Sequence, residues 1–418
     1  MAFTVSQRAS GVQTGAKASR TSGFAKVAVP CSVVRSLTAA GAVAYASAAK
    51  RATSVSCNAV STPATGTTAM SKKSEYSINT LTSWLFMLEK KGTITNELAV
   101  VLSSTALACK QISSLVNRSG ISNLTGLAGA ANVQGEDQKK LDVVSNEVFK
   151  NCLSICGRTG VLASEEEDFP MAVDIADAYS GNYIVVFDPL DGSSNIDAGI
   201  SVGSIFGIYE PSEECPMDAQ DDAQKLIEQC VVNVCQPGKD LVGAGYALYS
   251  SSTILVLSVG TGVYGFTLDP TIGEFVLTHD NVKIPETGKI YSFNEGNSML
   301  WDKNVQDYIN SLKDPAAWGG KPYSARYIGS LVGDFHRTLL YGGIYGYPGD
   351  AINKNGKLRL LYECAPMSYL AEQAGGAGST GKMRVLDIMP DAVHQRVPLF
   401  CGSKKEVELL ESFTMRPL

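Results

Sequence analysis

The sequence predicts an α/β protein built from two parts. Beyond about residue 75, stretches with helical periodicity alternate with short apolar runs that have the length of strands. After about residue 282 the order becomes helix, strand, helix, which indicates a second α/β part. The chain has 418 residues, enough for two packed domains. We therefore expect an N-terminal domain over residues 71–282 and a C-terminal domain over 283–418.

The segment before these domains has a different composition. It contains no acidic residue before Glu75, and its basic residues are scattered among Ser, Ala, Thr and Val. This composition is typical of an organellar transit peptide, which we place over residues 1–70 with cleavage between Lys50 and Met70. The alternative is a disordered tail.

Charge and hydropathy exclude two classes of partner. The full chain has a net charge of −6, and removal of the basic N-terminal segment would make the remainder more acidic. A nucleic-acid backbone needs a basic surface, so we expect no nucleic-acid partner. No run of 18 or more uncharged apolar residues occurs, so we expect no transmembrane helix.

The first two elements of the N-terminal part are predicted to be helices. Apolar side chains recur at helical spacing over residues 96–117, with Asn96 as the expected N-cap and Gly120 just past the end. A second helix is expected over residues 139–156. One face of each helix should pack inward.

Strands and further helices follow in order. The expected strands of the N-terminal part are 159–163, 183–188, 203–209, 240–249 and 253–259, followed by a hairpin that turns at "DPTIGE". The expected elements of the C-terminal part are helices over 301–312 and 329–341, a strand at "KLRLLYE" and a helix at "PMSYLAEQAGG".

Carboxylates gather at the ends of several apolar segments. The run "YIVVF" stops at Asp188 and Asp191 in "DPLDGSSNID", which taken alone is also good turn chemistry. Glu165 and Glu166 follow the short run "GVLA", and Glu363 ends "KLRLLYE". A further cluster, "GEDQKKLD", contains Glu136, Asp137 and Asp142. A buried scaffold can direct such groups into one cleft.

The types of residue in these clusters favour a magnesium-dependent phosphate site. Converging carboxylates repel one another and must share protons or cations. The three histidines, His279, His336 and His394, lie at no zinc spacing, and hard cations such as Mg²⁺ or Mn²⁺ prefer oxygen ligands. The segment after Asp191 begins Gly-Ser-Ser-Asn, whose N–H groups and hydroxyls suit an anion. Two cations would then assist in-line transfer of a phosphoryl group to water.

Several long motifs together resemble the fructose-1,6-bisphosphatase family. They are "DPLDGSSNID", "SEEED", "GEDQKKLDVVSN", "YSARYIGSLVGDFHRTLLYGGIYGYP" and "GKLRLLYECAPMSYLAEQAGG", in the order and spacing of that family. The resemblance covers roughly residues 75–415, and an insertion around Cys215 resembles the chloroplast form. It implies a layered αβαβα fold with two mixed-sheet subdomains and the active site between them.

The resemblance also implies roles for individual residues. The implied metal ligands are Glu165, Glu166, Asp188, Asp191, Glu363 and the carbonyl of Leu190. The implied catalytic groups are Asp142 and Glu166, which orient water and relay protons, together with a mobile-loop acid at Glu136 or, as the alternative, Asp137. The implied substrate contacts are Gly192, Ser193, Ser194, Asn294, Arg326, Tyr327, Tyr347 and Lys357, with Arg326 reaching in from a neighbouring subunit.

The implied function is that of an enzyme of the chloroplast stroma. It would hydrolyse the 1-phosphate of fructose 1,6-bisphosphate with two or three Mg²⁺ per subunit, or Mn²⁺, in the Calvin cycle and starch synthesis. A homotetramer is expected. The alternatives are a sedoheptulose-1,7-bisphosphatase, which residue types separate poorly, and a non-catalytic sugar-phosphate sensor, against which the complete acid set speaks.

A cysteine-containing segment over residues 210–236 is acidic and is expected to be a solvated loop. It holds Cys215, Cys230 and Cys235, and its end is expected to lead into a strand near Val231. A loop with unpaired thiols is one interpretation. The resemblance implies the other, a regulatory disulfide reduced by thioredoxin, with Cys215–Cys230 as the expected pair and Cys235 as an occasional substitute.

Overall fold

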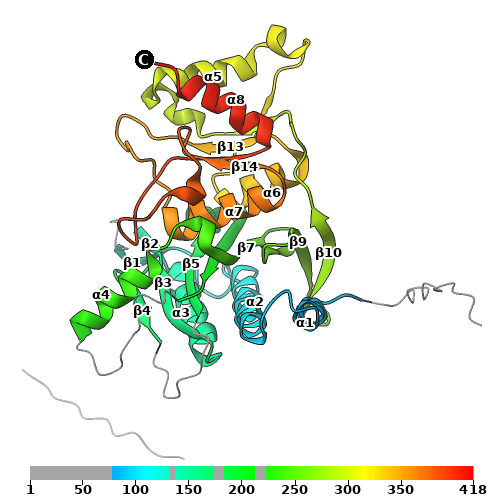
Figure 1. Cartoon of the computed structure of the whole chain (residues 1–418), viewed down its shortest axis with the longest axis vertical. Coiled ribbons are helices and arrows are strands. Elements are labelled where there is room, and N and C mark those ends of the chain that lie inside the picture. The colour runs from blue at the N-terminus through cyan, green and yellow to red at the C-terminus, as the bar shows by residue number, and fades with distance from the viewer. Residues whose placement is uncertain (1–77, 132–136, 174–182, 212–222, 418) are drawn as a thin grey trace, which may run out of the picture. The chain divides into compact units, whose positions relative to one another are not determined.

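A computed structural model describes residues 78–131, 137–173, 183–211 and 223–417. The expected transit peptide lies outside the described residues. Helices and sheets alternate in layers, as Figure 1 shows. The layers are, in order, helices α1, α2 and α3, an eight-stranded sheet, helices α6 and α7, a five-stranded sheet, and helices α5 and α8. The αβαβα prediction is confirmed.

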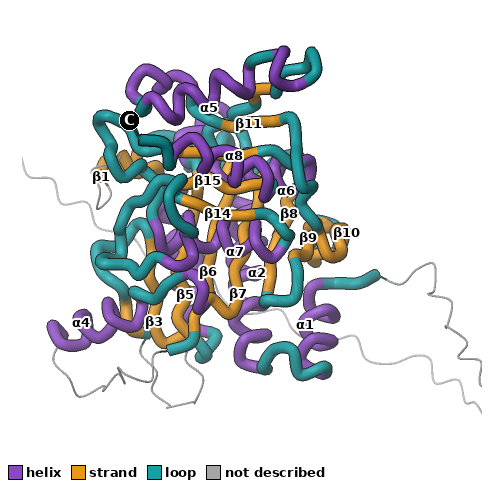
Figure 2. The backbone as a smooth tube through the Cα atoms, turned by 45° about the horizontal axis from the view of Figure 1, so that its top comes forward, coloured by secondary structure: helices purple, strands orange, loops and turns teal. Residues whose placement is uncertain are grey.

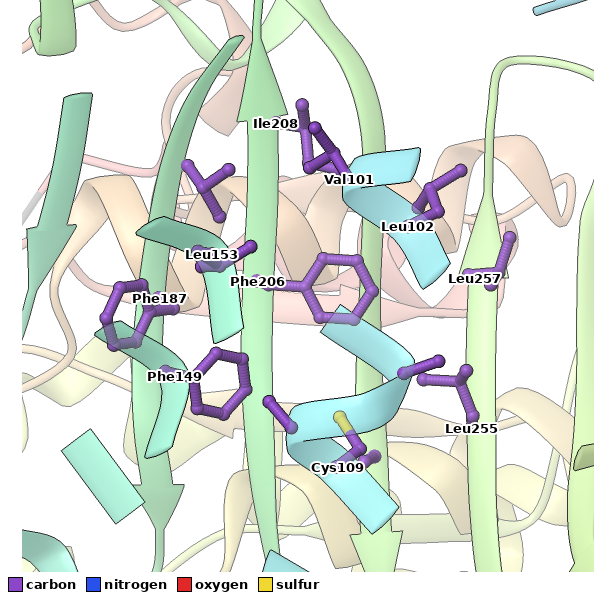
Figure 3. Close-up of a cluster of buried hydrophobic side chains, with 14 of the residues drawn as sticks. Val101, Leu102, Cys109, Phe149, Leu153, Phe187, Phe206, Ile208, Leu255 and Leu257 are labelled. Atoms are coloured by element: carbon purple, nitrogen blue, oxygen red, sulfur yellow. The ribbon is translucent and has the colours of Figure 1, made fainter. Parts of the chain in front are cut away.

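The first helical layer covers one face of the large sheet. It consists of α1 (Leu81–Lys90), α2 (Asn96–Val116) and α3 (Lys140–Ile155). Figure 3 shows α2 and α3 side chains, such as Leu102 and Phe149, packed on Phe187 and Phe206 of the sheet. Helix α2 is long and apolar enough to cross a membrane by length and composition alone, but half of its apolar window is buried inside the fold. The buried apolar residues of α2 therefore belong to the hydrophobic core. Its N-cap is Thr95, one residue before the expected cap, since the Thr95 hydroxyl accepts the N–H of Leu98.

The large sheet has mixed parallel and antiparallel strands in the order β10-β9-β8-β7-β6-β5-β3-β4. The strands are β3 (Thr159–Ser164), β4 (Met171–Ala172), β5 (Tyr183–Asp191), β6 (Val202–Tyr209), β7 (Leu241–Tyr249), β8 (Thr253–Ser258), β9 (Val263–Asp269) and β10 (Glu274–Val282). All nine residues of β5 are buried, because Val185 and Phe187 enter the cluster under α2 and α3 while Ile184 and Val186 enter one on the opposite face. Burial on both faces explains the continuous apolar run in the sequence.

The small sheet has the order β12-β11-β13-β15-β14 and is also mixed. Its strands are β11 (Ile290–Ser292), β12 (Ser324–Ala325), β13 (Ile344–Tyr347), β14 (Ala377–Ser379) and β15 (Leu399–Gly402). Its helices are α6 (Leu331–Tyr341) and α7 (Ala365–Gln373) on the inner side, and α5 (Lys303–Lys313) and α8 (Lys404–Thr414) on the outer side. Figure 2 gives a second view of the same layers. A separate two-stranded sheet pairs β1 (Leu127–Ala131) with β2 (Asp137–Lys139) in antiparallel orientation.

The strand expected at "KLRLLYE" is wrong. Residues Leu360–Cys364 form a π-helical turn, η5, that leads into α7. The N–H of Cys364 bonds to the carbonyl of Arg359, while the N–H of Leu360 bonds to Gln395. Residues 358–364 are all buried. Over so few residues, hydrophobic periodicity does not distinguish a buried strand from a buried helix.

The strand expected near Val231 is also wrong. Helix α4 (Ala223–Val234) occupies this part of the 210–236 segment. Its apolar residues Ile227, Cys230, Val231 and Val234 follow the i, i+3, i+4, i+7 spacing of one helix face, a pattern that the surrounding acidic residues obscure. Cys230 therefore lies within α4, and Cys235 directly follows its last residue.

Candidate active site

A cavity of about 330 Å³ lies where β5, α3, α6 and η5 approach one another. Its lining includes most of the predicted site residues: Asp142, Glu165, Glu166, Asp188, Leu190, Asp191, Gly192, Ser193, Ser194, Tyr327, Tyr347, Lys357 and Glu363. The four carboxylate clusters thus converge as expected wherever the structure describes them. Glu136 lies outside the described residues, and so does the side chain of Asp137.

Strand β5 brings two carboxylates to the cavity, and a glycine turns the chain away from it. Oxygens of Asp188, Asp191 and Glu363 lie within 4.8 Å of one another, and all three residues are buried. Gly192 has φ +73°, in the left-handed region, and begins the short 3₁₀ helix η1 (Ser193–Ala198). A Cβ at Gly192 would lie 2.8 Å from the Cβ of Ser330, so this turn requires glycine.

Asp191 is fixed by the N-terminus of α6. Its carboxylate accepts hydrogen bonds from the Ser330 hydroxyl at 2.7 Å, from the Leu331 N–H at 3.3 Å and from the Val332 N–H at 2.9 Å. A helix N-terminus favours a negative charge, and this contact joins the last residue of β5 to a helix about 140 residues later. Sequence reasoning did not identify Ser330 as part of the site.

Arg359 is a second residue that sequence reasoning missed. It is only 6% exposed. Its guanidinium lies 2.8 Å from the Glu165 carboxylate, and the backbone N–H of Arg359 donates to the Glu363 carboxylate at 2.6 Å. A buried cation thus stands among the predicted metal ligands. The i, i+4 spacing of Arg359 and Glu363 was visible in the sequence, whereas the pairing with Glu165 depends on the fold.

The acids that enter from α3 and β3 lie next to one another. Asp142 is buried in the first turn of α3, where its carboxylate accepts the Lys139 N–H at 2.7 Å and a hydrogen bond from the Ser193 hydroxyl. Glu166 accepts a hydrogen bond from the amide of Gln138, which also lines the cavity. Burial raises the pKa of Asp142 to about 7, and the negative charge of Glu166 adds to this shift.

The electrostatics of the cluster favour bound cations. Burial raises the pKa of Asp188 well above its ordinary value, and the carboxylates of Glu165, Asp191 and Glu363 raise it further. Burial raises the pKa of Glu363 too, although Arg359 opposes that shift. Divalent cations would relieve this repulsion, and an all-oxygen donor set suits hard cations such as Mg²⁺. The residues present therefore fit a divalent metal site.

The lining of the cavity also includes aromatic and basic side chains. Tyr327, Tyr345, Tyr347 and Lys357 line it. Two expected substrate contacts are placed elsewhere. Asn294 precedes a short 3₁₀ helix after β11 and Arg326 is exposed beside β12, and neither lines the described cavity.

Two of the three predicted redox cysteines, Cys230 and Cys235, lie among the described residues. Cys215 lies outside the described residues. Cys230 is buried in a cluster with Val161, Ala163 and Tyr362, which connects α4 with β3 and η5. Burial raises the pKa of the Cys235 thiol, and the nearby Asp391 carboxylate raises it further.

Comparisons with known proteins agree along most of the chain. Residues 79–280 match the family model of the fructose-1-6-bisphosphatase N-terminal domain, and residues 284–415 match that of its C-terminal domain. The chain is 67% identical over 367 residues to the chloroplastic fructose-1,6-bisphosphatase of Brassica napus, covering 87% of this chain and 88% of the relative. It is 65% identical to the chloroplastic fructose-1,6-bisphosphatase 1 of Arabidopsis thaliana, covering 87% of each protein. The crystal structure of Leishmania major fructose-1,6-bisphosphatase in holo form matches with a TM-score of 0.75 and 42% identity, over 81% of this chain and all of that chain.

Proposed function

The chain belongs to the fructose-1,6-bisphosphatase family, and on this premise we propose that it hydrolyses the 1-phosphate of fructose 1,6-bisphosphate in a chloroplast. The products are fructose 6-phosphate and inorganic phosphate. The observation that supports this most strongly is the convergence of Asp188, Asp191 and Glu363 beside the Gly-Ser-Ser turn at Gly192. Carboxylates for cations and donors for a phosphate thus share one cavity.

Mg²⁺ is the proposed cofactor, with two or three ions per subunit and Mn²⁺ as a substitute. The proposed ligands are the carboxylates of Glu165, Glu166, Asp188, Asp191 and Glu363 and the carbonyl of Leu190. When bound, the cations would neutralise these carboxylates and polarise the phosphoryl group and the attacking water. Arg359 and the N-terminus of α6 hold three of the ligands in place through the contacts described above.

Asp142 and Glu166 are the proposed proton-transfer pair. A pKa of about 7 leaves Asp142 partly ionised at neutral pH, which suits a group that accepts and returns a proton. Its hydrogen bond with Ser193 places it next to the proposed phosphate contacts Gly192, Ser193 and Ser194. Glu136, or Asp137 as the alternative, remains the proposed mobile-loop acid.

The sugar and its second phosphate are proposed to bind at Tyr327, Tyr347 and Lys357, which line the same cavity. Asn294 and Arg326 remain proposed contacts to that phosphate. The exposed position of Arg326 is compatible with a role across a subunit boundary in a homotetramer.

The division of the chain at about residue 282 and the location in the stroma remain proposals as well.

Purified protein is expected to release phosphate from fructose 1,6-bisphosphate with a kcat/KM at least about tenfold higher than from sedoheptulose 1,7-bisphosphate, because the two differ mainly in the pocket length they require. Initial rates with both substrates at saturating Mg²⁺ test this. A chelator should abolish the activity with either substrate. The reverse preference would favour the sedoheptulose enzyme, and binding without turnover would favour a sensor.

We also propose that a disulfide between Cys215 and Cys230 controls this site, with Cys235 as an occasional substitute. The packing of Cys230 supports a direct physical link between the disulfide and the site. The buried cluster around Cys230 contains Ala163 and Tyr362, which lie close in the chain to the acids after β3 and in η5. Closing such a loop constrains the chain by about 3 kcal/mol in the entropy model. Reduced thioredoxin would supply two electrons and two protons to open the disulfide.

Cys215→Ser protein is therefore expected to be fully active at low Mg²⁺ without reductant, whereas wild type requires dithiothreitol. Activity at low Mg²⁺, with and without dithiothreitol, measures this. Cys109→Ser is the matched control, because Cys109 is fully buried in α2, far along the chain from the segment, and should leave the requirement intact. A reductant requirement that persists in Cys215→Ser would show that the pairing is wrong, and a wild type without redox dependence would remove the switch altogether.

A further inference from the structure

His394 connects two segments that bear acids of the candidate site. Its Nε2 lies 3.0 Å from the carbonyl oxygen of Glu167, and its Nδ1 lies 2.8 Å from the hydroxyl oxygen of Tyr362. Glu167 directly follows Glu166, and Tyr362 directly precedes Glu363. One imidazole ring therefore contacts the neighbours of two proposed metal ligands that are almost 200 residues apart in the chain.

The partners of the ring determine its hydrogen-bonding pattern. A carbonyl oxygen can only accept, so Nε2 must donate to Glu167. In the neutral ring, Nδ1 then accepts the hydroxyl proton of Tyr362. Burial lowers the pKa of His394, which favours this neutral form. The tautomer that satisfies one contact is thus the one that satisfies the other.

The backbone around His394 is fixed as well. The carbonyl of Gln395 accepts the N–H of Leu360 at 2.7 Å, and the N–H of Val397 donates to Leu358 at 3.0 Å. Val393 is buried in the same cluster as Tyr362. The segment that bears His394 is thereby bonded to the chain on the N-terminal side of η5. The ring is thus fixed by its own two hydrogen bonds and by the backbone bonds of the segment that carries it.

We propose that His394 is a positioning residue that sets the separation of Glu166 and Glu363, and hence the affinity of the site for divalent cations. It does so through its hydrogen bonds to the Glu167 carbonyl and the Tyr362 hydroxyl. His394 does not line the described cavity, so it acts through these neighbours. Residues that orient metal ligands typically change affinity 10–100-fold when they are lost. The inference rests on the proposed metal-dependent function.

The test measures Mn²⁺ binding to the full chain by electron paramagnetic resonance, without substrate. His394→Ala is expected to raise the Kd for Mn²⁺ about tenfold or more. In assays, the Mg²⁺ concentration for half-maximal activity should rise by a similar factor while kcat at saturating Mg²⁺ changes much less. His279→Ala is the matched control. His279 lies on β10, the edge strand of the large sheet that is farthest from β3 and β4, and its ring bonds to the adjacent Thr278. It should leave both values unchanged.

Two milder variants keep the test decisive if His394→Ala fails to fold. Tyr362→Phe removes one hydrogen bond and should raise the Kd severalfold, and His394→Gln, which retains a donor for Glu167, should restore part of the affinity. A Kd within twofold of wild type in Tyr362→Phe and in every folded His394 variant would overturn the inference. If wild type itself binds no Mn²⁺, the proposed metal-dependent function fails and this inference fails with it. That outcome is distinct from unchanged Mn²⁺ affinity in the variants, which would overturn the inference alone.

Discussion

Asp188→Asn is expected to lower kcat at least about 100-fold while the protein remains folded. The carboxylate of Asp188 is 2% exposed and lies within 4.8 Å of the oxygens of Asp191 and Glu363. The amide keeps the size of the side chain and the oxygen that accepts the Leu190 N–H at 2.9 Å. It removes one negative charge from the ligand set. The loss of transition-state stabilisation should be comparable to that of a missing oxyanion-hole donor, about 2.7–4 kcal/mol.

The same change should not destabilise the metal-free protein, because it relieves repulsion among buried carboxylates. The measurements are kcat at saturating Mg²⁺ and Tm with and without Mg²⁺. Added Mg²⁺ should raise the Tm of wild type by mass action and that of the variant much less. Asp269→Asn is the control, because it makes the same chemical change at the last residue of β9, where the side chain accepts the N–H of Thr271. A variant that keeps more than a tenth of the wild-type kcat would show that Asp188 is not a ligand.

Gly192→Ala is expected to lower kcat more than about tenfold and to reduce stability. A left-handed φ costs a residue with a Cβ roughly 1–2 kcal/mol. The new methyl group would also lie 2.8 Å from the Cβ and 3.1 Å from the hydroxyl oxygen of Ser330. That hydroxyl donates to Asp191, so the displacement reaches a proposed metal ligand. Steady-state rates and thermal unfolding would measure the two effects.

Gly199→Ala separates the two causes. Gly199 has φ +66°, at the other end of η1, but a Cβ there would meet nothing within 4 Å. It should therefore show the loss of stability that comes from the backbone alone, with kcat close to wild type. Equal losses of activity in the two alanine variants would mean that contact with Ser330 does not matter.

The central strands of the large sheet could be predicted from the sequence because their burial on both faces leaves uninterrupted apolar runs. The acids at their ends could be predicted for the same reason, since the run stops where the cavity begins. The π-helical turn η5 could not, because a short buried segment has no periodicity that distinguishes it from a strand. Glu363 was nevertheless expected in the site in spite of the wrong secondary structure, because it ends an apolar run and because the resemblance implies that it is a metal ligand.

The supporting residues were beyond sequence reasoning for a different reason. Arg359, Ser330 and His394 each act through contacts with residues distant in the chain: Glu165, Asp191 and Glu167. These pairs leave no local pattern in the sequence. The two residues of each pair are brought together only by the stacking of the sheets, so their spacing along the chain does not indicate the contact. The acids were visible as clusters, whereas the groups that hold them were single residues among ordinary neighbours.

The bond between Asp191 and the start of α6 has a consequence for the maturation of the protein. Asp191 ends a strand of the large sheet, and its partners Ser330, Leu331 and Val332 precede or begin a helix that packs toward the small sheet. A nascent or truncated chain that has folded only its large sheet would expose Asp191 to water without these donors. Such a chain would bind cations poorly and would hydrolyse nothing. Activity would therefore appear only after the last third of the polypeptide has been synthesised and has docked, so that an incompletely assembled molecule would be inert instead of consuming sugar phosphates without control.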